Sequence, residues 1–176
     1  EGRYDHHGPQ TFGRKKLAAL LNAAGFVNRQ FLAPFPDYKL PVSILTEQWL
    51  DCAAFDAAAL AWQSARRDPQ LPPHLVFAPE LVWPVVVDNG LTLDLANSFL
   101  VVAGTSDGLL PDTSVLAYHY STDGRRAAFC KETLFFQRSD GSIALLYNSL
   151  GSIGSRSAEA QRVRCRIPPQ AATSQD

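Results

Sequence analysis

Two short segments carry side chains that could act on a small substrate, and the first lies near the amino end. Asp5, His6 and His7 are consecutive there. A histidine beside a carboxylate can act as a general base, because its pKa lies near neutral pH. The alternative is a solvated loop, since adjacent histidines in an extended segment point apart and are poor joint metal ligands. The segment therefore offers His6 or His7 as a base and predicts no metal site.

The second segment is a proline-rich stretch, residues 34–41, that contains Asp37, Tyr38 and Lys39. Three prolines in this stretch preclude a helix and favour a fixed, extended loop. An acid, a phenol and an amine on a stiff loop are well placed to bind a ligand. The alternative is ordinary turn chemistry, in which Asp37 binds its own backbone and Tyr38 packs. The residues alone leave both readings open.

Other chemical motifs are scarce. The chain has no G-x-G-x-x-G segment and no G-x-x-x-x-G-K-[ST] segment, so no nucleotide-binding loop is visible. Cys52, Cys130 and Cys165 are odd in number, widely spaced and lack a C-x-x-C pair. This pattern disfavours a disulfide framework and a zinc site, and it favours a reducing, cytoplasmic compartment.

Length and composition predict a globular chain of one domain or slightly more. Its 176 residues are 46% hydrophobic, which suffices for a core. Sixteen Lys and Arg against 17 Asp and Glu give a net charge of −1. We therefore expect no nucleic-acid partner. No run approaches the roughly 18 to 20 apolar residues of a membrane helix, so we also expect no membrane span.

The first half reads as alternating helix and strand. Leu17, Leu20, Leu21 and Ala24 recur at helical spacing before Gly25, which predicts a helix over residues 13–24. Residues 26–33 read as a strand that ends at Pro34, since proline cannot donate to a ladder. The alanine-rich residues 55–67 predict a second helix.

The second half reads as antiparallel sheet. Asp-Asn-Gly at 88–90 and Asp-Gly at 123–124 and 140–141 are strong turn signals between β-prone runs. The expected strands are residues 81–87, 95–103, 115–120, 127–138 and 143–147. Residues 151–176 are polar or small and predict a flexible tail, with a short strand at 163–167. The fold class is thus α/β followed by antiparallel β.

Three stretches together resemble a known family. The first covers residues 11–26 and contains Thr-Phe-Gly-Arg-Lys-Lys-Leu at 11–17, Leu-Leu at 20–21 and Ala-Gly-Phe at 24–26. The second is Pro-Phe-Pro-Asp-Tyr-Lys-Leu-Pro at 34–41, and the third is Asn-Ser-Phe-Leu at 97–100. They resemble the carboxy-terminal portion of bacterial class I S-adenosylmethionine-dependent methyltransferases linked with surface polysaccharide or glycan assembly. The resemblance extends from residue 1 to about residue 138, and the proline-flanked loop is its most specific motif.

The resemblance implies a division of the chain and a reaction. Residues 1–80 would be the late helix-strand part of a Rossmann-like methyltransferase domain, residues 81–150 an appended antiparallel β module, and residues 151–176 a flexible tail. S-adenosylmethionine is the implied cofactor. Its glycine-rich binding half is not in this chain, which begins at Glu1 and has no methionine. We therefore expect a fragment that belongs with further domains of the same polypeptide and binds no cofactor alone.

The implied acceptor is a hydroxyl of a glycan or another small polar molecule. His6 or His7 would remove the acceptor's proton, while Asp5, Asp37, Tyr38 and Lys39 would line its site. Acceptors sit where loops gather outside the ends of strands in open α/β sheets. The competing interpretation is a non-catalytic β-rich interaction or carbohydrate-binding module. Exposed Trp49, Trp62 and Trp83 would favour it, because aromatic platforms bind sugars.

Overall fold

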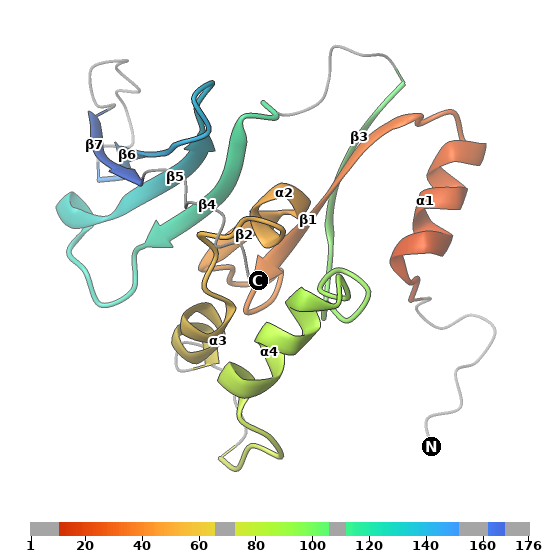
Figure 1. Cartoon of the computed structure of the whole chain (residues 1–176), viewed down its shortest axis with the longest axis horizontal. Helices are drawn as coiled ribbons and strands as arrows, with labels where there is room; N and C mark the ends of the chain where they lie inside the picture. The colour runs from red at the N-terminus through yellow and green to blue at the C-terminus, as the bar shows by residue number, and fades with distance from the viewer. Residues whose placement is uncertain (1–10, 66–72, 106–111, 152–161, 168–176) are drawn as a thin grey trace, which may run out of the picture.

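The computed structural model describes residues 11–65, 73–105, 112–151 and, as backbone, 162–167. These residues form a mixed α/β fold built on one antiparallel sheet (Figure 1). The helices are α1 (Arg14–Ala23), α2 (Glu47–Leu50), α3 (Ala57–Ala65) and α4 (Pro79–Asp88), with a 3-10 turn at Ala127–Phe129. The strands are β1 (Asn28–Phe35), β2 (Ser43–Thr46), β3 (Leu100–Gly104), β4 (Val115–Ser121), β5 (Lys131–Gln137), β6 (Ile143–Ser149) and β7 (Arg162–Ile167).

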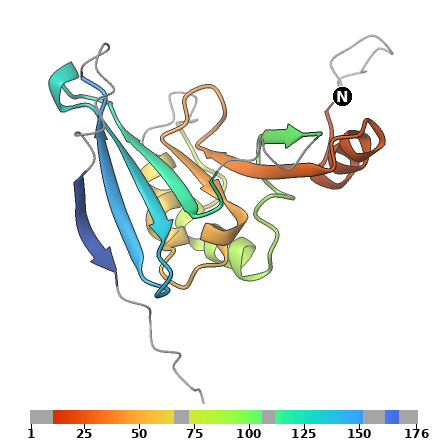
Figure 2. The same ribbon diagram turned by 90° about the horizontal axis from the view of Figure 1, so that it is seen from above.

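The sheet has seven strands in the order β3-β1-β2-β4-β5-β6-β7, and every described pairing is antiparallel. The two strands that precede residue 80, β1 and β2, lie between strands that follow it, because β3 flanks β1 and β4 flanks β2. Figure 2 shows β4 to β7 at one end of the molecule, α1 at the other, and α2 to α4 between them. The sheet therefore joins the two parts that the sequence analysis separates.

Most predicted elements are confirmed. The helix predicted at 13–24 is α1, and the helix predicted at 55–67 contains α3. The predicted strands at 115–120 and 143–147 are β4 and β6, and the short strand at 163–167 is β7. Gly124 and Gly141 have positive φ of 63° and 76°, as the two Asp-Gly turns require.

The predicted strand at 81–87 is wrong, because these residues belong to helix α4. Trp83 and Val87 are one helical turn apart and both face α3, whereas Leu81 and Val85 are exposed. Pro79 suits the first turn of a helix, where its missing N–H leaves no bond unmade. Asn89 and Gly90, predicted as a hairpin turn, instead end the helix, with Gly90 at φ 66°.

Three strand boundaries also differ from the predictions. β1 includes Pro34, which pairs with Ile44 of β2. β3 pairs with β1 only over residues 28–32, so at Pro34 one edge of the strand carries no ladder and the missing N–H is tolerated. The strand predicted at 95–103 begins only at Leu100, and the run predicted at 127–138 opens with the 3-10 turn before β5.

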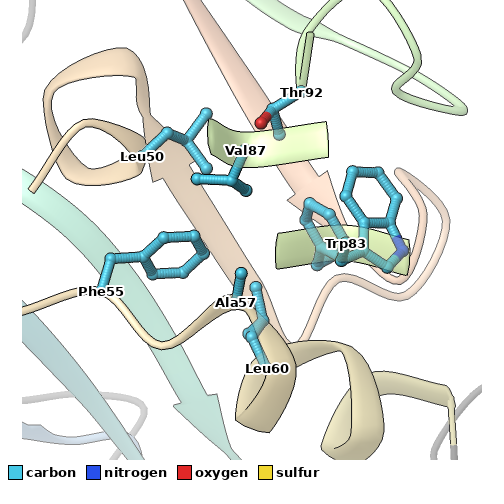
Figure 3. A pocket seen from close by; sticks show the side chains of 8 residues that line it. Leu50, Phe55, Ala57, Leu60, Trp83, Val87 and Thr92 are labelled. Carbon is cyan, nitrogen blue, oxygen red and sulfur yellow. The ribbon is translucent and has the colours of Figure 1, made fainter. Parts of the chain in front are cut away.

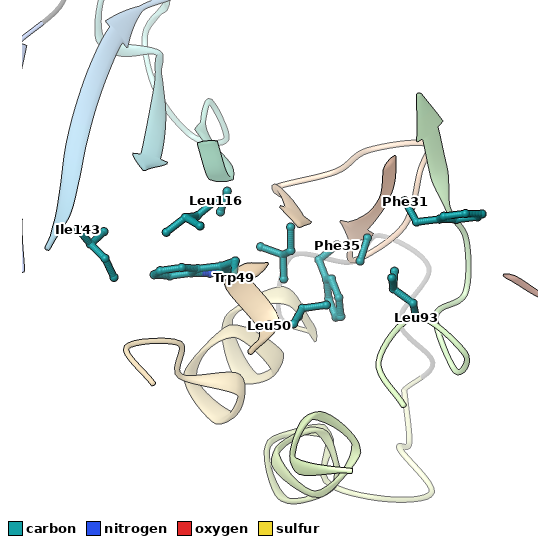
Figure 4. Packing of buried hydrophobic residues seen from close by; sticks show 10 residues of the cluster. Phe31, Phe35, Trp49, Leu50, Leu93, Leu116 and Ile143 are labelled. Carbon is teal, nitrogen blue, oxygen red and sulfur yellow. The ribbon is translucent and has the colours of Figure 1, made fainter. Parts of the chain in front are cut away.

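The core lies between the sheet and the helices. Figure 4 shows it running from Ile143 and Leu116 past Trp49 to Phe35 and Phe31. Trp49 is 7% exposed and lies 5.2 Å from the ring of Phe135. It is placed by the short helix α2, whose first turn is capped by the Thr46 hydroxyl.

Candidate functional site

The loop between β1 and β2 is fixed by Asp37. Its carboxylate accepts the backbone N–H of Lys39 at 2.6 Å and that of Leu40 at 3.4 Å, and the side chain is 9% exposed. A carboxylate that binds its own backbone two residues on forms an Asx turn. The Phe35-Pro36 peptide bond at the start of the loop is cis. Asp37 therefore binds its own backbone and shapes the loop, which is the ordinary turn chemistry that the sequence analysis gave as an alternative.

Tyr38 and Lys39 are presented outward by that turn. The Tyr38 side chain is 62% exposed, and the Lys39 Nζ lies 5.9 Å from the centroid of its ring. This distance is within the range of a cation–π contact. The loop consequently offers an aromatic face and an ammonium group together at the surface, where a polar ligand could contact both.

The three residues at the amino end, Asp5, His6 and His7, lie outside the described residues. That this segment and Tyr38 line one acceptor site therefore stays a prediction. Among the residues that the structure does describe, no group of three or more His, Cys, Asp or Glu side chains could hold a metal ion.

A second set of polar side chains lies on the sheet and was not anticipated from the sequence. Ser43 Oγ and His119 Nδ1 are 2.9 Å apart, and Ser43 is 3% exposed. They are paired across β2 and β4 although 76 residues separate them. Only the strand register brings them together, so no local sequence signal could have found the pair.

This pair lines a cavity of about 250 Å³ between the sheet and the start of α3. The cavity has aromatic walls and a few polar groups, a composition typical of small-molecule sites. Its principal side chains are Ser43, Trp49, Phe55, Asp56, His119 and Phe135.

By contrast, the space between α3 and α4 is packed. Figure 3 shows Leu60 of α3 and Trp83 and Val87 of α4 converging there with Phe55 and Leu50. The ring of Trp83 contacts that of Phe35 edge-on, with centroids 5.0 Å apart. No volume remains there for a water molecule, so this surface is a helix interface and not a ligand site.

Two tyrosines of β4 have perturbed acidities. Burial raises the pKa of Tyr120 to about 12, with a further contribution from the nearby Glu132 carboxylate, which also accepts a hydrogen bond from Tyr120. Glu132 is held by Asn148, whose Nδ2 donates to it at 2.8 Å. Burial also raises the pKa of Tyr118, followed by the charges of Glu132 and Asp112. Both phenols stay protonated near neutral pH and are unsuited to act as bases there.

The tryptophans do not form a shared platform. Trp49 is buried, and Trp83 is packed against the core; Trp62 is 45% exposed. Exposed tryptophans would have favoured a carbohydrate-binding module. Because two of the three indoles are buried or packed against the core, a sugar-binding surface made of several exposed indoles is disfavoured.

One further motif was overlooked in the sequence. Residues 104–108 read Gly-Thr-Ser-Asp-Gly, which matches the G-x-S-x-G pattern of hydrolases. That pattern is meaningful where a strand turns into a helix around the serine. Here β3 ends at Gly104, residues 106–111 lie outside the described part, and the next described element is strand β4. The match therefore supports no catalytic role.

Comparisons of the chain with protein-family models, with curated protein sequences and with solved structures found no match. Within the described residues, no helix has the length and apolar character needed to cross a membrane.

Proposed function

We propose that this chain is the acceptor-side portion of an S-adenosylmethionine-dependent methyltransferase that methylates a hydroxyl of a glycan or another small polar acceptor. The observation that carries the proposal is the loop between β1 and β2. The Asp37 carboxylate stabilises the turn by accepting the Lys39 N–H. The turn exposes Tyr38, and the Lys39 ammonium lies near its ring. A preorganised aromatic ring and cation can orient a polar acceptor with little loss of conformational entropy.

The order of elements also supports the proposal. Helix α1 passes through Gly25, at φ 86°, into β1, and the loop follows that strand. This is the helix-strand-loop succession that the resemblance implies. The described strands pair antiparallel, whereas Rossmann-like sheets are mostly parallel. The proposal therefore requires parallel strands that are not among the described residues.

The described residues do not fit the cofactor itself. They contain no strand that runs through a glycine-rich turn into the first turn of a helix, which is the arrangement that binds adenosine-containing cofactors. We propose that His6 or His7 removes the acceptor's proton. Tyr38 and Lys39 contact the acceptor, and Asp37 positions their loop.

The proposal is tested by comparing this chain with a longer protein from the extended reading frame. Calorimetric titration should show S-adenosylmethionine binding to the longer protein and none to the 176-residue chain. Methyl transfer by the longer protein is then measured with a panel of monosaccharide glycosides as acceptors. Replacement of the correct histidine by alanine should lower kcat by roughly 10² or more, the usual scale for a general base.

Tyr38 supplies the matched pair of variants. Tyr38→Ala should lower kcat/KM for the acceptor by about tenfold, which corresponds to the loss of roughly 1.4 kcal/mol of transition-state stabilisation. The variant should leave cofactor affinity unchanged. Tyr38→Phe keeps the ring and should retain most activity if stacking matters more than the hydroxyl. Failure of the longer protein to bind S-adenosylmethionine would remove the proposal. Unchanged turnover in the two single histidine variants and in the variant with both His6 and His7 replaced by alanine would remove histidine from the mechanism.

A further inference from the structure

We propose that the cavity between α3 and the sheet binds a small aromatic amine. The cavity is defined by strands β2, β4 and β5 on one side and by α2, α3 and their connection on the other. Its volume of about 250 Å³ is just below the roughly 300 to 1,000 Å³ of typical ligand pockets. It therefore suits a compound of one or two rings. This inference does not depend on methyl transfer.

The walls favour an aromatic ligand. The ring centroids of Trp49 and Phe55 are 5.9 Å apart, and the two ring planes make an angle of 57°. The centroids of Trp49 and Phe135 are 5.2 Å apart, with an angle of 45° between the planes. All three rings line the cavity. Aromatic rings prefer tilted or offset contacts at these separations, so a further ring can join the cluster in the same geometry. Leu45 and Leu60 complete the apolar lining.

The polar groups favour a ligand that donates hydrogen bonds. The Ser43 hydroxyl is hydrogen-bonded to His119 Nδ1, and the tautomer of the imidazole decides which group donates. A hydroxyl has one donor and two acceptor positions, so its oxygen can still accept an N–H from a ligand. Because Ser43 is 3% exposed, a donor that reaches it is shielded from water.

The charge of the lining favours a cation. Asp56 is the one carboxylate among the lining residues within the described part of the chain, and no lysine or arginine is among them. One oxygen of Asp56 accepts the Ala59 N–H at 2.8 Å at the start of α3. A carboxylate has about four acceptor positions on two oxygens, so it can bind an ammonium as well. Anionic ligands such as phosphates find no compensating charge in this cavity.

A series of three ligands that share the indole ring and differ in charge tests whether the cavity binds such a ring and whether it prefers a cation. Amide NMR shifts of the isotope-labelled chain are followed during titration with tryptamine, indole and indole-3-propionate, which are cationic, neutral and anionic. Tryptamine should bind with a Kd near or below about 1 mM, as expected for a ligand of this size. It should bind about three- to fivefold more tightly than indole, since one exposed ion pair contributes up to about 1 kcal/mol. The propionate should be weakest.

Variants assign the effect to the cavity. Asp56→Asn keeps a side-chain acceptor for the Ala59 N–H but removes the charge, so the preference for tryptamine over indole should disappear. The matched control is Asp51→Asn, at the end of α2 and outside this cavity, which should leave all three affinities unchanged. Gln63→Trp, at an exposed position on the rim, should fill the entrance and weaken all three ligands.

Three results would overturn the inference. They are no saturable binding of tryptamine up to about 10 mM, equal affinities for the three indoles, and shifts confined to residues away from the cavity. The ligand series on the wild-type chain is decisive by itself if a variant fails to fold. Because it uses this chain without S-adenosylmethionine, its failure is distinct from failure of the proposed methyltransferase function.

Discussion

The Asp37 carboxylate replaces water as the partner of two backbone N–H groups in a loop that contains three prolines. We predict that Asp37→Ala lowers the free energy of unfolding by about 1 to 3 kcal/mol, the cost of leaving a partly buried donor unpaired. Asp37→Asn keeps an acceptor oxygen and should cost less. Urea denaturation measures both differences.

Asp112 provides the control for Asp37. It accepts the Ser114 N–H at 2.9 Å in a similar turn, but it is exposed. Water can replace this bond, so Asp112→Ala should cost no more than about 0.5 kcal/mol. Equal losses in the two alanine variants would show that Asp37 does not stabilise its loop beyond ordinary turn chemistry.

Tyr120 gives a second prediction at the scale of single residues. Its pKa is raised to about 12 by burial and by Glu132, whereas an unfolded tyrosine titrates near 10. The folded chain therefore holds this proton more tightly than the unfolded chain does. Stability from Tyr120 is fully present below pH 10 and is lost as the pH rises from about 10 to about 12.

The measurement compares wild type with Tyr120→Phe, which cannot ionise. The difference in unfolding free energy between the two should be constant from pH 7 to 9 and should then shift in favour of phenylalanine above pH 10. A difference that stays constant up to pH 12 would show that the Tyr120 phenol is not protected from ionisation in the folded chain.

Among the elements, α4 depends on its contacts with α3 and β1 more than on its own sequence. Trp83 contacts Phe35 edge-on and, with Val87, closes the interface against Leu60 of α3. Proline occurs at two positions of the helix, Pro79 and Pro84, and the second removes an internal hydrogen bond. Tertiary packing must compensate for that loss.

We predict that Trp83→Ala lowers the free energy of unfolding by about 2 to 4 kcal/mol, slightly below the usual range for a fully buried tryptophan. The control is Trp62→Ala on α3, where the indole is 45% exposed and the cost should remain below about 1 kcal/mol. Thermal and urea unfolding measure both. A larger loss at Trp62 than at Trp83 would contradict the packing of α4 described above.

At the scale of the whole molecule, one sheet links sequence on both sides of residue 80. Thr46 Oγ1 donates to the Leu116 carbonyl at 2.7 Å, and β2 pairs with β4 over three residue pairs. The core cluster likewise joins Phe35 and Trp49 to Leu116 and Ile143. The two parts therefore bury some of their apolar side chains against each other.

We therefore predict a single cooperative unfolding transition for the chain. The unfolding transition followed by tryptophan fluorescence, which reports on Trp49, Trp62 and Trp83, should coincide in urea with the transition followed by amide signals of β5 and β6. Two separated transitions, with β5 and β6 surviving the loss of the tryptophan signal, would show that these strands fold independently of the part of the chain that holds the tryptophans.

Local features of the sequence determined much of this architecture. Helical spacing before Gly25 predicted α1, Asp-Gly pairs predicted the turns at Gly124 and Gly141, and the proline-rich stretch predicted a fixed loop after β1. Each signal depends on backbone preferences within a few residues. Such preferences act before any distant contact forms, which makes them readable from the sequence.

Tertiary structure decided the remaining features. The valine run at 85–87 suits a strand or a buried helix equally well, and its packing against α3 selected the helix. Ser43 meets His119 only because β2 pairs with β4 in one register, since a shift by one residue would turn each side chain to the other face. Strand register and burial depend on contacts between residues far apart in the chain, and no local pattern encodes those contacts.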